Sequence, residues 1–146
     1  MPSIAEFLAA EHRQCDDHFA AAEESAHAAD LTGCRIHFQQ FQAAMERHFR
    51  NEEDVLFPAF EQATSSTMGP TRVMRLEHRQ IRDALADMSS ALTGSDLEEY
   101  LGQAETLLIL TQQHNIKEEQ ILYPMCDQML GNTAGLMIQA MQDLPA

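Results

Sequence analysis

The feature that most constrains this chain is an eleven-residue motif that occurs twice. The copies begin at His48 and His114, and both read His-x-x-x-Glu-Glu-x-(Val/Ile)-Leu-(Phe/Tyr)-Pro. On a helix, residues four apart lie one above the other on the same face. Each copy therefore presents an imidazole and a carboxylate to a common point, from His48 with Glu52 and from His114 with Glu118.

A second, shorter repeat has the same spacing. The tetrapeptide Glu-His-Arg-Gln, which contains His12, recurs unchanged around His78. Its two copies are 66 positions apart, and so are the two copies of the longer motif. The common shift indicates an internal duplication, over about residues 4–62 and 70–128, in which both halves keep one His followed by His-x-x-x-Glu.

The length and the residue pattern predict one helical domain. At 146 residues the chain matches a single domain, residues 1–146, that can bury a substantial core. Four amphipathic stretches have helical spacing, and breakers separate them at 30–33, 64–70 and 94–95. We expect an all-α, up-down-up-down four-helix bundle with a short C-terminal helix over 136–141.

Local signals mark some of the helix ends. Ser3 with Glu6, and Ser95 with Glu98, have the spacing of capping boxes, which predicts helix starts at these places. Pro58 is expected to kink or end the second helix, because proline lacks the backbone donor that a helix interior needs.

The turns place the repeated residues at one height in this bundle. In an antiparallel hairpin, two residues lie level when the turn is at their midpoint. The midpoint of His12 and His48 is residue 30, that of Glu52 and His78 is residue 65, and that of His78 and His114 is residue 96. Each midpoint falls in or beside a breaker, and an error of two residues moves a side chain only about 3 Å along the axis.

The six repeated residues are the candidate metal ligands. Each lies on the apolar stripe of its helix, where imidazoles and carboxylates cost several kcal/mol unless they are paired or coordinated. Two divalent metals would offset this cost, each with two histidines and with the two glutamates as bridges; a metal-free His–Glu network is the alternative. Such ligands suit Fe, Mn, Zn or Co. The predicted ligands are His12, His48, Glu52, His78, His114 and Glu118.

The neighbours of these residues have less specific patterns. Apolar residues near the predicted ligands are expected to line a dry, gas-sized pocket. Cys15, one turn from His12, is expected to be a small core residue, with redox sensing as the alternative. The expected pocket residues are Leu8, Met45, Phe49, Met74, Ile81 and Leu122.

Other polar residues flank the site or lack a copy. Four glutamates next to predicted ligands are expected to be solvated or to hydrogen-bond them from outside. Three further histidines have no counterpart in the other half and are expected at the surface or at the bundle end. The glutamates are Glu11, Glu53, Glu77 and Glu119, and the histidines are His18, His27 and His37.

Composition restricts the partners. Nine Lys and Arg against 23 Asp and Glu give a net charge of −14, which disfavours nucleic acid and anionic membranes. Three cysteines without a Cys-x-x-Cys pair favour a reducing, cytoplasmic setting. No signal peptide is evident, and the longest apolar run, 107–110, is too short to span a membrane.

The two motifs resemble the hemerythrin-like family of His-His-Glu cation-binding domains, from about Ile4 to Met125. The resemblance implies a non-haem di-iron centre, two irons with an oxo or hydroxo bridge, on the six residues named above; manganese or zinc are alternatives. Oxygen-carrying hemerythrins have five histidines, two of them four apart on the third helix, whereas here Met74 stands four before His78. The set is similar to the symmetric four-His, two-Glu version in the wider family.

Three functions are compatible with such a site. The first is binding or sensing of O₂, NO or peroxide, with no output domain evident in the chain and the protein partner unknown. The second is a di-iron oxidoreductase of the peroxidase or NO reductase type. The third is iron storage or delivery. We expect the first, since no pocket for an organic substrate and no separate general base can be identified.

Overall fold

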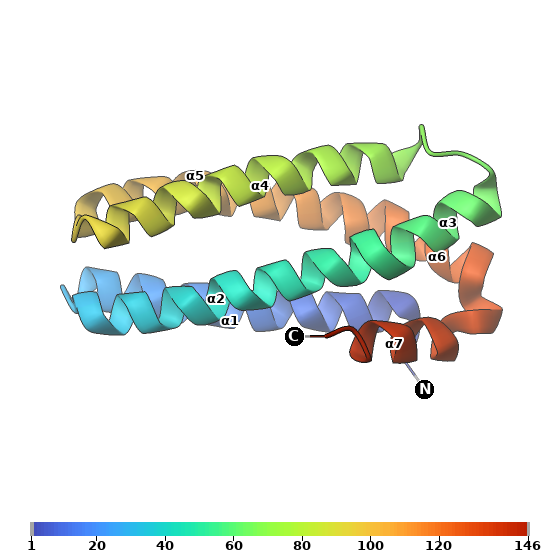
Figure 1. Ribbon diagram of the computed structural model, residues 1–146, viewed down its shortest axis with the longest axis horizontal. Coiled ribbons are helices and arrows are strands. Elements are labelled where there is room, and N and C mark those ends of the chain that lie inside the picture. The colour runs from blue at the N-terminus through green and yellow to red at the C-terminus, as the bar shows by residue number, and fades with distance from the viewer. Residues whose placement is uncertain (1, 146) are drawn as a thin grey trace.

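The computed structural model describes residues 2–145, which form an up-down-up-down helical bundle without strands in that range (Figure 1). None of these helices combines the length and the hydropathy that a membrane-spanning segment requires. The bundle has four long helical segments, which we call rods. The second and fourth rods each consist of an α-helix, a π-helical turn and a further α-helix. The elements are α1 (Ile4–His27), α2 (Leu31–Arg50), η1 (Asn51–Leu56), α3 (Phe57–Thr64), α4 (Pro70–Thr93), α5 (Leu97–Lys117), η2 (Glu118–Leu122), α6 (Tyr123–Leu130), η3 (Gly131–Thr133) and α7 (Ala134–Gln142).

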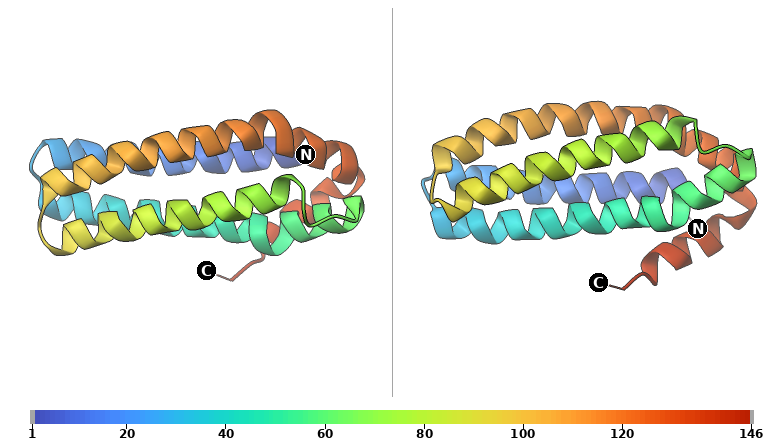
Figure 2. Two further views of the ribbon diagram at one scale, coloured as in Figure 1. Left: turned by 90° about the horizontal axis from the view of Figure 1, so that it is seen from above. Right: turned by 45° about the horizontal axis from the view of Figure 1, so that its top comes forward.

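The rods pack as two antiparallel hairpins. Helix α1 packs on α2 and α4 packs on α5, while α1 with α5 and α2 with α4 close the bundle, as the two views of Figure 2 show. The apolar core forms two clusters along the bundle axis. One runs from Cys15 and Phe49 toward the turns at 28–30 and 94–96, and the other surrounds Leu8 and Leu122 near the opposite end. The predicted ligands lie between these clusters.

All three turns between the rods use a left-handed residue that is not glycine. Ala29, Ser65 and Ser95 have φ values of 57°, 55° and 58°. The residue after each of them donates its backbone N–H to the carbonyl five positions back, at 2.9–3.1 Å, which satisfies the end of the preceding helix. These turns lie where the breakers predicted them.

The caps agree in part with the sequence prediction. Ser3 and Glu6 form the predicted capping box of α1. The prediction that Ser95 caps α5 is wrong, because Ser95 is the left-handed turn residue. Asp96 is the N-cap instead, and its carboxylate accepts from the backbone N–H of Glu99 at 3.0 Å.

Each copy of the long motif contains a π-helical turn. The backbone N–H of Phe57 donates to the carbonyl of Glu52, and that of Tyr123 to the carbonyl of Glu118, so each bond spans five residues. Proline follows at once in both copies, and its ring would clash with the carbonyl four residues back in a regular helix. The wider turn accommodates the ring, so the rod continues past Pro58 rather than ending there.

The predicted C-terminal helix is present as α7, which packs on η1 and α1. Arg47 holds its end: the guanidinium donates to the backbone carbonyls of Met141 at 2.9 Å and Gln142 at 3.1 Å, and also to that of Leu144. These bonds satisfy carbonyls that the helix end leaves open. The three cysteines are all buried and free.

Candidate metal centre

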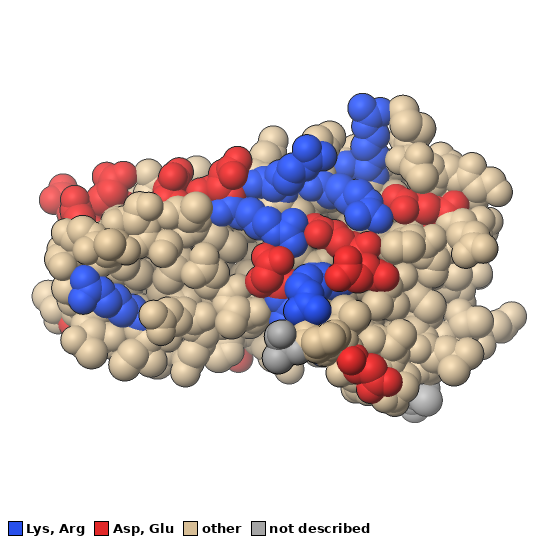
Figure 3. Space-filling view, viewed as in Figure 1, with Lys and Arg blue, Asp and Glu red and all other residues tan. Residues whose placement is uncertain are grey.

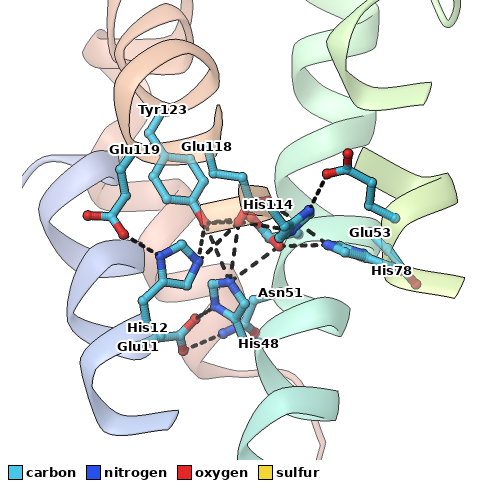
Figure 4. A network of polar contacts seen from close by, with 12 residues as sticks. Glu11, His12, His48, Asn51, Glu53, His78, His114, Glu118, Glu119 and Tyr123 are labelled. Atoms are coloured by element: carbon cyan, nitrogen blue, oxygen red, sulfur yellow. Dashed lines mark hydrogen bonds and ion pairs between the residues drawn. The ribbon is translucent and has the colours of Figure 1, made fainter. Parts of the chain in front are cut away.

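The six predicted ligands converge in the middle of the bundle, from four rods. Figure 4 labels five of them, all except Glu52. All are buried, with at most 4% of any residue exposed. They form two overlapping groups in which every potential ligand atom lies within 4.8 Å of the others. One group is His12, His48 and Glu118; the other is Glu52, His78, His114 and Glu118.

The carboxylates lie between the imidazoles. Oε1 of Glu52 is 3.3 Å from Nε2 of His48 and 3.1 Å from Nε2 of His78. Oε1 of Glu118 is 3.0 Å from Nε2 of His12 and 3.2 Å from Nε2 of His114. Each glutamate therefore contacts one histidine from each half of the chain, as a bridging carboxylate would.

Several buried atoms at this point have no hydrogen-bond partner among residues 2–145. Buried polar atoms are nearly always satisfied, and an exception needs a physical reason. The chemistry of these atoms, neutral imidazole nitrogen and carboxylate oxygen, is that of ligands for a divalent transition metal. The residues thus fit a bound metal pair. The unsatisfied atoms here are Oε1 of Glu52, Nε2 of His78, Nε2 of His114 and Oε2 of Glu118.

A second carboxylate orients each imidazole from outside. Because an ionised carboxylate only accepts hydrogen bonds, Nδ1 of each ring carries the hydrogen and Nε2 is turned toward the centre. Such partners fix the ring and raise its basicity as a metal ligand. We call these four glutamates the outer carboxylates. The pairs are His12 with Glu119 at 2.8 Å, His48 with Glu11 at 2.8 Å, His78 with Glu53 at 2.5 Å, and His114 with Glu77 at 2.8 Å.

The outer carboxylates follow the repeat of the sequence. Glu11 and Glu77, which are 66 positions apart, each accept from the motif histidine of the next rod in their own half. Glu53 and Glu119, also 66 apart, each accept from the first histidine of the other half. Of the two roles expected for them, solvation or contact with the ligands, the structure shows the contact.

The outer carboxylates are held by further polar groups that differ between the halves. Asn51 donates to Glu11 at 2.7 Å, whereas Lys117, which is 66 positions on, donates to Glu77. Arg82 donates to Glu53 at 2.9 and 3.1 Å. Figure 3 shows basic and acidic side chains next to one another in the central part of one face of the molecule.

Tyr123 also reaches the site, and the sequence reading did not single it out. Its hydroxyl donates to Oε2 of Glu52 at 2.6 Å and lies 3.0 Å from Oε1 of Glu118. The same hydroxyl is 3.2 Å from Nε2 of His12 and 3.4 Å from Nε2 of His48. Tyr123 is the aromatic residue of the second motif copy, and the π-helical turn aligns it with Glu118.

Comparison with known proteins gives the family of the chain. The profile of the hemerythrin HHE cation binding domain matches residues 3–126. The chain belongs to this hemerythrin family. No curated protein and no solved structure gave a match.

Without metal, the electrostatics of this hemerythrin site favour the protonated forms of His48, His78 and His114. Burial lowers the pKa of His114, but the charges of Glu118 and Glu52 and the hydrogen bonds to Glu118 and Glu77 together outweigh it and raise that pKa to about 9. Burial also lowers the pKa values of His48 and His78, but the charges and hydrogen bonds of their carboxylate neighbours outweigh it, and both pKa values are raised. Burial and the charge of Glu118 raise the pKa of Glu52. Divalent cations would replace these protons as the counter-charge.

Two of the outer carboxylates, Glu53 and Glu77, have lowered pKa values. Burial raises the pKa of Glu53, but hydrogen bonds from His78 and Arg82 lower it to about 2. The pKa of Glu77 is lowered too, because the hydrogen bonds from Lys117 and His114 outweigh its burial. The acceptors that orient His78 and His114 therefore keep their charge at neutral pH.

The cavity beside the site differs from the predicted pocket. It is lined by Met45 and Phe49, as expected, and by Cys15. The other four predicted residues pack in the two core clusters instead: Ile81 in one, and Leu8, Met74 and Leu122 in the other. Burial raises the pKa of the Cys15 thiol to about 11, so it is a neutral, small core group at pH 7.

The three remaining histidines lie apart from the hemerythrin site. His27 is exposed at the end of α1, and His18 and His37 are half-buried. None of them belongs to a candidate metal group among the described residues.

Proposed function

We propose that the protein is a non-haem di-iron protein that binds or senses a small ligand: O₂, NO or peroxide. The observation that carries this proposal is the pairing of a buried four-His, two-Glu cluster with a cavity of one small molecule's size. The family supports cation binding, and the donor set supports a transition metal.

Iron is proposed because each half offers two histidines and a carboxylate. That set with open positions is typical of non-haem iron sites. Bound iron would supply an open coordination position and a change of oxidation state. The protein supplies the four Nδ1 anchors, which fix the rings before metal arrives.

A small ligand is favoured over an organic substrate by the space at the site. The enclosed cavity that borders His12 and His48 has a volume of about 10 Å³, which is the room that one water-sized molecule needs. Burial of all six ligands also favours tightly held metal over rapid exchange, and so favours ligand binding over storage or delivery.

The test is metal analysis with absorption spectroscopy on protein purified without added metal, then reduced and exposed to O₂ and to NO. We expect two irons per chain and a spectrum that changes with gas. Two zincs, or two irons that respond to neither gas, would overturn the proposal and favour metal handling or a structural role. Steady turnover of NO or peroxide by the iron-loaded wild-type protein would identify an enzyme instead.

A further inference from the structure

A surface groove runs between α1 and the rod of α5 and η2. It is open to solvent and has a volume of about 650 Å³. No Lys or Arg of the described chain lines it, so it combines apolar surface with negative charge. Its apolar residues are Phe19, Ala20, Leu108 and Ile116, and its acidic residues are Asp16, Glu23 and Glu119.

The repeat provides an equivalent surface between α4 and the rod of α2 and η1, where a cation closes it. Arg82, which is equivalent to Asp16, donates to Glu53 at 2.9 and 3.1 Å and to Glu46 at 3.0 Å. Its guanidinium carbon also lies 5.1 Å from the centroid of the Phe49 ring. One arginine thus covers apolar surface and neutralises two carboxylates, among the charged side chains in the centre of Figure 3.

The groove beside α1 lacks this cation. Glu119, which is equivalent to Glu53, accepts from His12 at 2.8 Å but pairs with no Lys or Arg within residues 2–145 (Figure 4). The Glu119 side chain is 43% exposed, against 20% for Glu53. Asp16, in the place of Arg82, adds a second negative charge. This half of the molecule therefore presents carboxylates whose counter-charge is not supplied by the chain.

The groove is also more apolar than its equivalent. Ile116 is 53% exposed, whereas its counterpart is Arg50, which pairs with Asp54 at 4.0 Å. Leu108 is half-buried, and its counterpart is Gln42. Exposed apolar surface surrounded by polar groups is typical of a site for another protein.

The dimensions of the groove match a short helix. Its lining runs from Leu108 to Gln120 along the fourth rod, which is about 18 Å at a rise of 1.5 Å per residue. A helix of about three turns covers that distance. Amphipathic helices commonly bind in such grooves, with apolar residues spaced three or four apart making the contacts.

We propose that this groove is the docking site for a basic, amphipathic helix of another protein. An Arg or Lys of that helix lies against Glu119 and Asp16, as Arg82 lies against Glu53 in the other half. Its apolar side chains pack on Phe19, Leu108 and Ile116. The docking goes beyond the proposed function and does not depend on which metal or small ligand the site takes.

Charge distinguishes this occupant from a second copy of the chain. The net charge is −14, so two copies repel each other. Six of the nine Lys and Arg side chains already bind carboxylates or backbone carbonyls. They are Arg35, Arg47, Arg50, Arg75, Arg82 and Lys117. The chain therefore has few free cations to offer to the groove of a neighbour.

A synthetic helix provides the first test. The probe is a fluorescent peptide of two Leu-Lys-Lys-Leu-Leu-Lys-Leu heptads, added to the full-length protein and measured by fluorescence anisotropy. We expect a Kd of about 1–100 μM that rises with salt, and no binding of the matched peptide with Glu in place of Lys. Absence of binding up to about 1 mM of the Lys peptide would overturn the proposal.

Two neighbouring aspartates give a matched pair of variants. Asp16→Arg copies the closed half and should weaken peptide binding at least about tenfold. Asp17→Arg makes the same change in net charge at the next residue, which is exposed and does not line the groove, and should weaken binding less than about threefold. Equal losses would mean that the peptide responds only to net charge, and would overturn the proposal.

Two isoleucines of α5 test the apolar contact. Ile116 and Ile109 are 53% and 56% exposed, but only Ile116 lines the groove. Ile116→Ala should weaken peptide binding about fivefold to tenfold, while Ile109→Ala should leave it unchanged. Because both positions are exposed, neither variant depends on the packing of the core. Equal affinities of the two Ala variants would contradict docking in this groove.

Sedimentation velocity tests the competing occupant. We expect the wild-type, Asp16→Arg and Asp17→Arg proteins to have the same association state over a range of concentrations. A wild-type dimer that Asp16→Arg abolishes and Asp17→Arg keeps would assign the groove to a second copy of the chain and overturn the proposal.

Discussion

At the scale of single residues, both halves of the site depend on Glu118. Its carboxylate belongs to both candidate metal groups and lies 3.0 Å from His12 and 3.2 Å from His114. Glu118→Ala should therefore lower the metal content and the thermal unfolding temperature together, because metal binding is coupled to folding. Elemental analysis and thermal unfolding of the same sample provide the measurement.

Two further proteins complete this comparison. His78→Ala should act in the same direction, while the exposed His27 has no partner in the site and His27→Ala should change neither quantity. The coupling would be refuted if metal-free and metal-loaded wild-type protein melted at one temperature.

Substitution of an outer carboxylate should affect metal binding less than loss of a predicted ligand. Glu77→Gln keeps an acceptor for Nδ1 of His114 but removes its charge, so the ring becomes a poorer ligand. Loss of such a partner typically weakens metal binding by roughly 10–100-fold. A chelator competition measures this affinity, with the exposed Glu24→Gln as the control. An unchanged affinity for Glu77→Gln would show that this contact does not tune the metal.

Some of these residues could be predicted from the sequence and some could not. The six buried residues were identifiable because a helical spacing and a duplication constrain them twice. Tyr123 was not, since its equivalent is Phe57 and the position reads as apolar. The hydrogen bond from His78 to Glu53 crosses between rods, and no pattern along one helix contains that information.

At the scale of elements, the turn after α1 carries strain that can be relieved. Ala29 is exposed and has φ 57°, a conformation that costs a residue with a Cβ about 1–2 kcal/mol. Glycine avoids this cost but loses more entropy on folding. Ala29→Gly should therefore stabilise the protein by roughly 0.5–1 kcal/mol, measured by denaturant unfolding.

The neighbouring residue is the matched control. Ala28 caps the same helix with φ −83°, where a Cβ causes no strain. Ala28→Gly should destabilise the protein by roughly 0.5–1 kcal/mol, since only the entropic cost remains. Destabilisation by both substitutions would mean that the left-handed turn is not populated in solution.

Sequence patterns predict some features of these elements and not others. The three turns were predictable from breakers, and the four rods from amphipathic spacing. The π-helical turns were not, because hydrophobic periodicity over five or six residues does not distinguish a bond across five residues from one across four. The repeated prolines, Pro58 and Pro124, were the only sequence signal of these turns. In the structure each proline follows a π-helical turn and does not end the helical segment.

At the scale of the whole molecule, the site should give the metal-free and metal-loaded proteins opposite responses to pH. In the metal-free protein the pKa of His114 is raised from 6.5 to about 9, and those of His48 and His78 are also raised. Protonated histidines in the folded state therefore add stability that is fully present below pH 6.5. That stability is lost as pH rises through about 9, and His114 alone accounts for about 3 kcal/mol.

Metal loading reverses the sign, because a bound metal and a proton compete for the same Nε2 atoms. Loading at pH 7 should release protons, and metal affinity should rise from pH 6 to pH 9. Unfolding temperatures measured over this range should fall for the metal-free protein and hold or rise for the loaded one. A pH-indicator titration at pH 7 counts the released protons. If the metal-free protein kept its stability between pH 7 and pH 9 and no proton appeared on loading, the histidines would already be neutral before metal binds, and the carboxylates around them would not act as the charge partners that the geometry assigns to them.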